Sequence, residues 1–428
     1  MRAAVVLALV ALLVVAPLSR AQDADDSALV RDAYDFVRQY ALRPPEASTM
    51  LARMLAAVQP HAGDGAVPPS LGGDPQADLE AVAAYAAAVA RARPERAEIV
   101  LAAVLRALLQ DLGDPLAAVF APAQFARYME ELRGEHGGIG AQVDRIGGRI
   151  VISDVTAGGP AARAGLAPGD ALLDVNDRPT ADRTPDTVLD LLHGRPGTTV
   201  AVTVQRGGRA PQRHVLTREV ARENPTRSTV LEPRIGYLRL LEFIEGSEQD
   251  VGRALAGLRR RGAGALVLDL RQNTGGLVEE AVAVASFFLD EGVVAMEENR
   301  EGMVPLPVRP AERFAGPVVV LVDFFTASAG EIVAGALQDA GAVLVGTKTF
   351  GKATVQSVSI PPLPGGWGLR VTTARYYTRR GRLIEGTGLQ PTVTVPMAMS
   401  FIQSSQDVQL QEALGRLHAQ LGARSGRP

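Results

Sequence analysis

ALVLDLRQNTGG, residues 265–276, is an apolar run that ends in a glycine turn. Only Asp269 interrupts the apolar residues between Ala265 and Leu270, which is typical of a buried strand. A helix is predicted to follow, with an apolar face that includes Leu277, Val278, Ala281 and Val284. The turn therefore presents backbone amides at a helix N-terminus, where they suit an oxyanion or a phosphate. Its glycine spacing differs from that of a Walker or Rossmann loop, so nucleotide binding is disfavoured.

A second strand-to-helix junction follows further along the chain. The apolar strand Pro317–Val322 leads into TASAGE, residues 326–331, and then into a helix predicted to end near Gly341. The hydroxyl of Ser328 is thus placed where a strand turns into a helix. One interpretation is a capping box, because Glu331 follows three residues later and the serine would then only bind helix amides. The other interpretation is a catalytic nucleophile.

The segment Thr349–Gln356 carries the polar residues that favour catalysis. It is predicted to open a strand that places Lys352 and Gln356 on one face, because strand side chains alternate with period two. Phe350 and Val355 flank the lysine, and burial among apolar residues would lower its pKa and free the amine to accept a proton. The alternatives are a solvated lysine and a glutamine that decorates an edge strand.

A small β-rich domain is predicted between residues 137 and 222. A short helix at Pro160–Ala164 is closed by Gly165, and a turn then enters a strand at about Asp170. The strand candidates are short β-branched runs separated by glycine turns: Ile150–Ile152, Ala171–Val175, Val200–Val204 and His214–Leu216.

A glycine-rich segment precedes the first strand of this domain. It consists of Gly138, Ile139, Gly140 and Ala141. Glycine there lets the backbone approach a ligand closely, so that exposed amides can bind a terminal carboxylate and an extended peptide can add as a strand. An ordinary turn that feeds a strand is the alternative. Over roughly 80 residues this domain resembles a PDZ domain of the type found in periplasmic proteases.

From about Leu112 onwards the chain resembles the carboxyl-terminal processing peptidases, or tail-specific proteases. The resemblance is carried by residues 137–140, the PDZ-like core, and the segments 268–276, 326–338, 349–356 and 372–377. It implies that Ser328 is the nucleophile, Lys352 the general base and Gln356 the amide that orients the lysine. Two departures are visible. Thr326 and Gly330 replace the outer serines of a Ser-Ala-Ser-Ala-Ser-Glu run, and Thr274 replaces the proline of an Asn-Pro-Gly-Gly turn.

The expected reaction is attack of Ser328 on a peptide carbonyl, with neutral Lys352 as base. The amides of Ala329 and of the Gly275 and Gly276 turn are expected to stabilise the oxyanion. Substrates would be proteins or peptides with free C-termini, and no cofactor or metal is expected. A Ser-His-Asp triad is a poorer account, since none of the five histidines lies between residues 234 and 396.

Two other functions remain open at this stage. The chain could be a catalytically silent peptide-binding or scaffold member of the same family, although it retains the serine, the lysine and the glutamine. It could also be a crotonase-like acyl-CoA enzyme, since such enzymes share a ββα core and glycine oxyanion turns. A PDZ-like domain and an export signal make the second alternative the poorer one.

The rest of the chain is predicted to be helical. Apolar residues recur at helical spacing in residues 22–133, as in Leu101, Leu105, Leu108 and Leu112. A Pro- and Gly-rich break, Pro60–Pro75, is predicted to be a loop. The Ala-rich stretch Ala81–Ala92 suits close helix packing and leaves a homo-oligomer open, as does the C-terminal helical tail, residues 397–428.

Composition and the N-terminus place the chain in a broad class. The sequence has 428 residues, 47% of them hydrophobic, no cysteine and a net charge of −3. This composition is globular, excludes thiolate chemistry and makes nucleic acid an unlikely partner. Arg2 and an apolar run of about 16 residues, Ala3–Leu18, predict a cleaved export signal over residues 1–21, because a membrane span needs roughly 20. An uncleaved signal would tether the protein to the membrane.

These observations predict an α+β multidomain protein located in the periplasm or elsewhere in the cell envelope. The expected division is a signal at 1–21, a helical region at 22–133, a PDZ-like domain at 137–222, a Ser-Lys peptidase core at 223–396 and a helical tail at 397–428. The core is expected to have the ββα fold shared by ClpP and crotonases.

Overall fold

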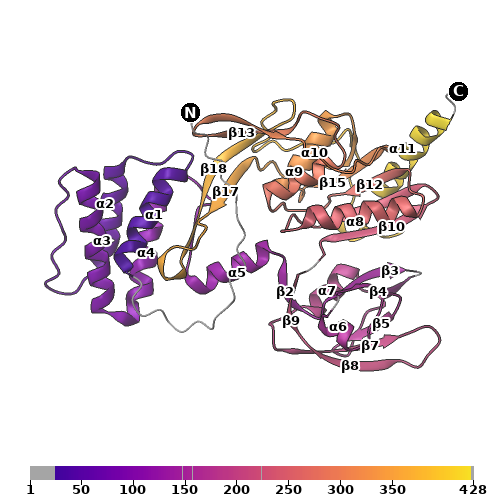
Figure 1. Cartoon of the computed structure of the whole chain (residues 1–428), viewed down its shortest axis with the longest axis horizontal. Helices are drawn as coiled ribbons and strands as arrows, with labels where there is room; N and C mark the ends of the chain where they lie inside the picture. Colours follow the sequence, from indigo (N-terminus) through magenta and orange to yellow (C-terminus); the bar gives the residue numbers. More distant parts are fainter. Residues whose placement is uncertain (1–24, 147, 157, 223, 426–428) are drawn as a thin grey trace. The chain divides into compact units, whose positions relative to one another are not determined.

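The computed structural model describes residues 25–146, 148–156, 158–222 and 224–425. The expected export signal, residues 1–21, lies outside this range. The described residues form two compact units, the first within residues 25–39, 44–122 and 358–370 and the second within residues 40–43, 123–357 and 371–425. Helices and several sheets are present, and the α+β multidomain prediction is confirmed (Figure 1).

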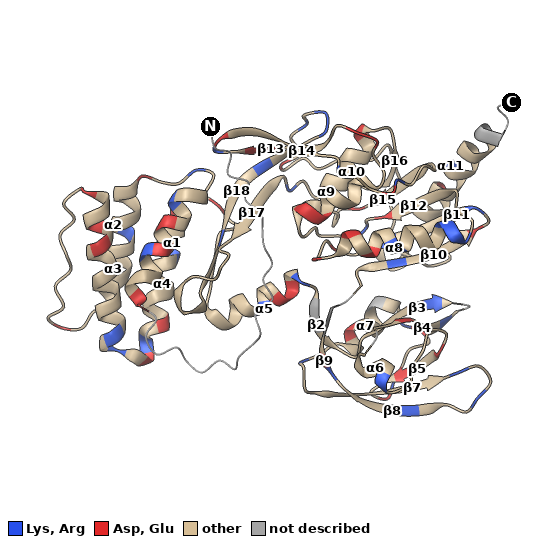
Figure 2. Ribbon diagram, viewed as in Figure 1, with Lys and Arg blue, Asp and Glu red and all other residues tan. Residues whose placement is uncertain are grey.

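The first unit is a helical bundle in the segment where apolar periodicity predicts helices. Its helices are α1 (Asp26–Tyr40), α2 (Ala47–Val58), α3 (Pro75–Ala92) and α4 (Ala97–Gln110), with the short 3₁₀ helices η1 (Gln59–His61), η2 (Pro94–Arg96) and η3 (Pro364–Gly366). α2 packs on both α3 and α4, and the buried faces include Leu51, Met54 and Leu105. Acidic and basic residues are interspersed along these helices (Figure 2). Of the predicted loop Pro60–Pro75, residues 62–74 contain no regular helix or strand, whereas the start of the loop lies in η1 and its last residue begins α3.

The β-rich domain lies in the second unit. Its sheet has the order β3-β4-β5-β7-β8, formed by β3 (Ala141–Ile146), β4 (Arg149–Val155), β5 (Ala171–Val175), β7 (Thr199–Gln205) and β8 (Gln212–Thr217). The other elements of this domain are α6 (Pro160–Arg163), α7 (Pro185–Leu192), β6 (Arg178–Pro179), and the pair β2 (Glu135–Gly138) with β9 (Glu219–Arg222). The helix α5 (Pro122–Leu132) precedes the domain in the sequence. All four predicted runs fall within β4, β5, β7 and β8, and β3 is the strand expected after the glycine-rich segment. The helix α7 was not predicted.

A six-stranded sheet forms the centre of the remaining block. Its order is β10 (Thr226–Glu232), β11 (Ile235–Leu240), β12 (Ala265–Asp269), β15 (Val318–Val322), β16 (Val343–Gly346) and β19 (Val393–Thr394). From β11 to β19 every neighbouring pair is parallel. The helices α8 (Ser247–Arg260), α9 (Val278–Ser286) and α10 (Ala329–Asp339) share one core with the sheet. Ala413 and Leu417 of α11 (Val408–Ser425) belong to a second core that contains Tyr237 and Val267 of the sheet (Figure 1).

A second sheet carries the lysine segment. It contains β13 (Val293–Asn299), β14 (Gly302–Pro307), β17 (Thr354–Val358) and β18 (Gly368–Thr378). β18 pairs with β17 and with β13, and its first residues pair with β1 (Ala118–Phe120). The last short element is η4 (Met399–Phe401). Among the described residues, no helix combines the length and apolar character needed to cross a membrane.

Candidate active site

Ser328 lies in a strained turn between β15 and α10. It is the N-cap of α10 and has φ 53° and ψ −118°, a region that residues other than glycine rarely occupy. The turn is held by Asp323, whose Oδ1 accepts hydrogen bonds of 3.0 Å from the amides of Phe325 and Thr326. The Thr326 hydroxyl donates to the main-chain oxygen of Leu270, 2.8 Å away. A serine in such a backbone conformation is fixed by its surroundings rather than by its own preference.

The structure brings Ser328, Lys352 and Gln356 together, as the sequence predicts. Lys352 Nζ lies 3.3 Å from Ser328 Oγ, 2.6 Å from Gln356 Oε1 and 3.1 Å from the main-chain oxygen of Thr354. Gln356 Nε2 donates to Thr372 Oγ1 on β18, at 3.1 Å. The amide side chain is therefore held from its other end, which fixes the oxygen that faces the lysine.

Two details of the lysine segment differ from the expectation. β17 begins at Thr354, so Lys352 lies in the loop before the strand and not on the strand itself. The positive φ of Gly351, 92°, breaks the extended conformation just ahead of the lysine. Phe350 is 51% exposed, so the aromatic ring does not bury Lys352. Three oxygen atoms, from Ser328, Thr354 and Gln356, lie within 3.3 Å of the amine.

The Glu331 carboxylate joins the serine turn to the lysine loop. Its Oε2 accepts from the amides of Ser328, at 3.0 Å, and Lys352, at 2.9 Å. Its Oε1 accepts from the Gly351 amide, at 2.8 Å, and from the Thr349 hydroxyl. The side chain is fully buried, and desolvation raises its pKa although the four hydrogen bonds oppose that shift. From the sequence, Glu331 is predicted only to cap the helix, and its contact with the lysine loop is not predicted.

Tyr376 on β18 is a further residue that sequence reasoning missed. Its hydroxyl lies 3.1 Å from the main-chain oxygen of Ser328 and 3.0 Å from that of Lys352. Burial raises the pKa of this phenol well above its usual value, so it stays a neutral donor at physiological pH. No local sequence pattern distinguishes Tyr376 from its neighbour Tyr377.

The glycine turn after β12 lies against the serine. Gly275 and Gly276 have φ 111° and 130°. A Cβ atom on Gly275 would lie 2.8 Å from Ser328 Cβ, and one on Gly276 would lie 2.2 Å from the main-chain oxygen of Phe243. Only glycine fits these positions. The Gly275 amide donates to Asn273 Oδ1 at 2.9 Å. Among the described residues, none of the hydrogen bonds uses the amide of Gly276 or Ala329.

Three phenylalanine rings are exposed on the serine turn and the lysine loop. Phe324, Phe325 and Phe350 are 53%, 43% and 51% exposed. The ring centroids of Phe324 and Phe325 lie 5.6 Å apart, and those of Phe324 and Phe350 also lie 5.6 Å apart. The Phe350 amide donates to the Thr326 main-chain oxygen at 3.1 Å, which ties the two turns together. Phe325 precedes Ser328 by three residues, a chain length that spans at most about 11 Å.

The predicted peptide-binding residues lie at the edge of the β-rich domain's sheet. Gly138 ends β2, Ile139 and Gly140 form the connection, and Ala141 begins β3. Gly140 has φ 68°, and its carbonyl oxygen accepts from the Thr156 amide at 2.9 Å. None of the hydrogen bonds among the described residues uses the amides of Ile139 and Gly140. β3 is the terminal strand of its sheet and packs beside α7.

Comparison with known proteins identifies the class of protein. The profile of peptidase family S41 matches residues 234–395, and that of a PDZ domain matches residues 151–206. The first match covers the glycine turn, the serine turn and the lysine loop, and the second covers most of the β-rich domain. The chain is therefore a serine-type peptidase that carries a PDZ domain.

Curated relatives narrow the class further. The chain is 34% identical to a carboxyl-terminal-processing protease of Synechocystis over 322 residues, which covers 72% of this chain and 75% of that protein. It is 32% identical to the carboxy-terminal processing protease CtpA of Bacillus subtilis, with coverage of 68% and 62%. The chain belongs to the carboxyl-terminal-processing protease family. A solved structure of the photosystem II D1 C-terminal processing protease aligns with a TM-score of 0.49 and 26% identity, over 86% of this chain and 93% of that one.

Proposed function

We propose that the protein is an endopeptidase with a Ser-Lys dyad. Ser328 Oγ attacks the peptide carbonyl, while the neutral amine of Lys352 takes the hydroxyl proton and later returns it to the leaving amine. The observation that supports this proposal is the distance of 3.3 Å between Lys352 Nζ and Ser328 Oγ. Gln356 and the main-chain oxygen of Thr354 orient the amine.

The proposed base requires a deprotonated lysine, and the oxygens around Lys352 Nζ can accommodate one. A neutral amine has two N–H donors and one lone pair, whereas an ammonium has three donors and none. Gln356 Oε1 and the Thr354 main-chain oxygen can take the two donors, at 2.6 and 3.1 Å. The lone pair then addresses the Ser328 hydroxyl, which can both donate and accept. Each group in the cluster thus has a role that needs no charge on the lysine.

The residue composition also supports a lysine base. Lys348 and Lys352 are the only two lysines, so all the other residues among the 44 Lys and Arg positions are arginine. A guanidinium stays protonated in proteins and cannot accept the serine proton. The basic side chain that lies 3.3 Å from Ser328 Oγ is therefore a lysine, the one that can act as a base.

The amides of Ala329 and Gly276 are the proposed oxyanion donors. Of the three predicted residues Ala329, Gly275 and Gly276, only Gly275 has its amide engaged, by Asn273 Oδ1. The N-terminus of α10 adds its positive end to the same site. Loss of one such donor typically lowers kcat by about 100-fold to 1,000-fold, or roughly 2.7–4 kcal/mol.

The PDZ domain is proposed to capture the C-terminus of the substrate. The Ile139 and Gly140 amides would bind the terminal carboxylate, and the residues before it would add as a strand to the edge of β3, beside α7. Gly138 and Ala141 complete the loop. The unused amides and the unpaired edge support this role. A preference for an apolar residue near the scissile bond is also proposed, because Phe324, Phe325 and Phe350 offer apolar surface on the two catalytic turns.

We also propose that the protein is exported and acts in the cell envelope, on the basis of the apolar run Ala3–Leu18. Fractionation of cells that express the full chain tests this location. Recovery from the cytoplasm would contradict it.

The catalytic proposal is tested by incubating wild type and Ser328→Ala with an unstructured protein and mapping the products by mass spectrometry. Wild type is expected to cleave next to apolar residues, and the variant is expected to be inactive with an unchanged melting temperature. Cleavage by the Ser328→Ala variant at the wild-type rate would exclude the dyad. If neither protein cleaves but both bind the free tail, the chain is the silent scaffold member.

A further inference from the structure

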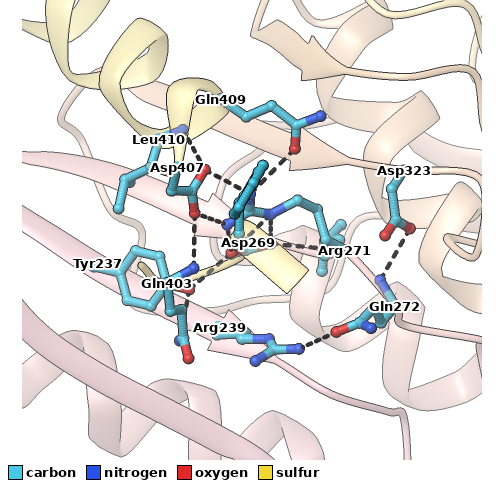
Figure 3. A network of polar contacts seen from close by, with 12 residues as sticks. Tyr237, Arg239, Asp269, Arg271, Gln272, Asp323, Gln403, Asp407, Gln409 and Leu410 are labelled. Carbon is cyan, nitrogen blue, oxygen red and sulfur yellow. Dashed lines mark hydrogen bonds and ion pairs between the residues drawn. The ribbon is translucent and has the colours of Figure 1, made fainter. Parts of the chain in front are cut away.

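Arg271 precedes the glycine turn in the sequence, and its side chain is fully buried. It lies between carboxylates from two distant parts of the chain (Figure 3). On one side its Nε and Nη2 donate to Asp269, at 2.9 and 2.6 Å. On the other side Nη1 and Nη2 donate to the two oxygens of Asp407, at 2.9 Å each. Gln409 Oε1 accepts a further bond from Nη1 at 3.1 Å. The C-terminal tail therefore supplies three of the five oxygen atoms that accept hydrogen bonds from this buried guanidinium.

Asp407 and Gln403 fix the tail at this point. The Asp407 carboxylate accepts from the amides of Gln403 and Leu410, at 2.9 Å each, and so caps the start of α11. Gln403 Nε2 donates to the Tyr237 hydroxyl at 3.0 Å, and that hydroxyl donates to Asp269 at 2.7 Å. The contacts close a ring around Arg271, as Figure 3 shows. Burial alone would raise the pKa of Asp269, but the nearby Arg271 outweighs it and the pKa is lowered.

The backbone of Arg271 leads directly into the proposed oxyanion turn. The next residue, Gln272, has φ 62°, and its amide donates to Asp323 Oδ1 at 3.0 Å. Asp323 is the same carboxylate that holds the serine turn. The main-chain oxygen of Asn273 then accepts a hydrogen bond of 2.9 Å from the Ala327 amide. A displacement of Arg271 would therefore move both the glycine turn and the serine turn, which begin within a few residues of these contacts.

We propose that Asp407 is a positioning residue for catalysis, which holds the oxyanion turn in place through Arg271. The tail then has two separable roles. α11 packs on the sheet, with Ala413 and Leu417 in the second core, while Asp407 sets the position of the Gly275 and Gly276 amides. This inference rests on the proposed use of the Gly276 amide.

The argument depends on what remains when the Asp407 charge is removed. Arg271 would still be paired with Asp269, so the buried cation is not left alone. Nη1 and Nη2 would, however, no longer donate to a charged acceptor at position 407, and only Nη2 and Nε would still donate to Asp269. The guanidinium would then move towards Asp269. Displacements of about 1 Å in a catalytic group can lower the rate by about 100-fold. The effect should therefore be on turnover rather than on substrate capture.

The test compares Asp407→Asn, Asp407→Glu and Leu417→Ala with wild type at 25 °C, with the folded fraction measured by circular dichroism. Asp407→Asn is expected to lower kcat about 10-fold to 100-fold with KM unchanged. Asp407→Glu keeps the charge and both oxygens, so its kcat should be close to that of wild type. Leu417→Ala is the matched control, because it removes buried tail contacts away from Arg271 and should lower the melting temperature without lowering kcat per folded molecule. The affinity of the PDZ domain for a tail peptide should be the same in all four proteins.

A kcat for Asp407→Asn equal to that of wild type would overturn the inference, as would an equal loss of kcat in Leu417→Ala. If Asp407→Asn does not fold, Gln409→Met replaces it, since it removes one acceptor of Nη1 and should give a smaller loss of kcat. Ser328→Ala is run in parallel. Residual cleavage by that variant would contradict the proposed dyad itself, whereas an inactive Ser328→Ala with a fully active Asp407→Asn contradicts only the role of the tail.

Discussion

Glu331→Gln is the substitution that best tests how the two catalytic turns are held together. The glutamine side chain keeps the shape of the glutamate but replaces one acceptor oxygen with an NH2 donor. In the wild type each oxygen accepts two hydrogen bonds, Oε1 from Thr349 and Gly351 and Oε2 from Ser328 and Lys352. Whichever way the amide turns, its NH2 group faces two groups that are donors in the wild type.

The less costly orientation places the NH2 group towards Thr349 and Gly351. The Thr349 hydroxyl can rotate and accept, because a hydroxyl is both donor and acceptor. The buried Gly351 amide cannot, and an unsatisfied buried N–H costs about 1–3 kcal/mol. Loss of the charge weakens the two remaining hydrogen bonds. It also removes the free-energy cost of burying a charge, the effect that raises the pKa of Glu331. Since these last two effects oppose each other, we expect the free energy of unfolding to fall by about 1–3 kcal/mol.

The pH dependence of this difference has a definite sign. The pKa of Glu331 in the folded protein is raised above its ordinary value of 4.5. Its contribution to stability is therefore fully present below the unfolded pKa and is lost as pH rises through the folded pKa. Glutamine has no such proton. The stability of wild type minus that of Glu331→Gln should thus be larger at about pH 4 than at about pH 8.

Urea denaturation at both pH values measures the difference, and peptide hydrolysis measures kcat. We expect kcat to fall at least about tenfold, because Gly351 directly precedes Lys352 and its displacement moves the base. Glu385→Gln is the matched control. The exposed Glu385 accepts a hydrogen bond from the Ala353 amide at 2.6 Å, and this is its one hydrogen-bond partner among the residues that the structure describes. A glutamine oxygen can accept the same bond, so the effect on stability should stay within about 0.5 kcal/mol. Equal stability and kcat in Glu331→Gln and wild type would refute the reasoning.

Two further predictions concern the base and the substrate tail. Lys352→Arg should lower kcat by at least about 100-fold, because the guanidinium stays protonated, while the same change at the exposed Lys348 should leave kcat unchanged in the same hydrolysis assay. An active Lys352→Arg enzyme would show that Lys352 supplies only charge. Amidation of a substrate's C-terminus should lower kcat/KM about tenfold or more at limiting substrate, since the Ile139 and Gly140 amides lose a charge-assisted hydrogen bond of about 1.5–3 kcal/mol. Equal kcat/KM for free and amidated tails would leave the PDZ domain without a role in capture.

Local sequence patterns predicted the elements that carry the catalytic groups. β12 and β15 were expected from apolar runs, and the turns that follow them were expected from glycine and the TASAGE segment, residues 326–331. These features depend on neighbouring residues, which is why periodicity and turn chemistry suffice. The position of Lys352 before β17 was not predicted, because the start of a strand depends on pairing with β18 and not on the segment alone.

The residues that hold the site in place were not predictable in the same way. Glu331 contacts Lys352, 21 positions away, and Arg271 contacts Asp407, 136 positions away. Asp407 follows Gln406 in an unremarkable polar stretch, and Tyr376 has a tyrosine neighbour. Nothing in the spacing of these residues marks them, because their partners come together only when the sheet and the tail have folded.

The parallel sheet explains why the local signals nevertheless coincide with the site. β12 and β15 are adjacent and parallel, so their carboxyl ends meet at one edge of the sheet. The glycine turn leaves the end of β12, and the Ser328 turn leaves the end of β15. Two patterns about 50 residues apart are therefore brought into contact by topology alone. The lysine loop and the tail come from outside this parallel pair, so each needs a buried carboxylate, Glu331 or Asp407, to bind it to the edge. Charge at these two positions is thus expected to affect turnover more than a similar loss of stability elsewhere in the sheet.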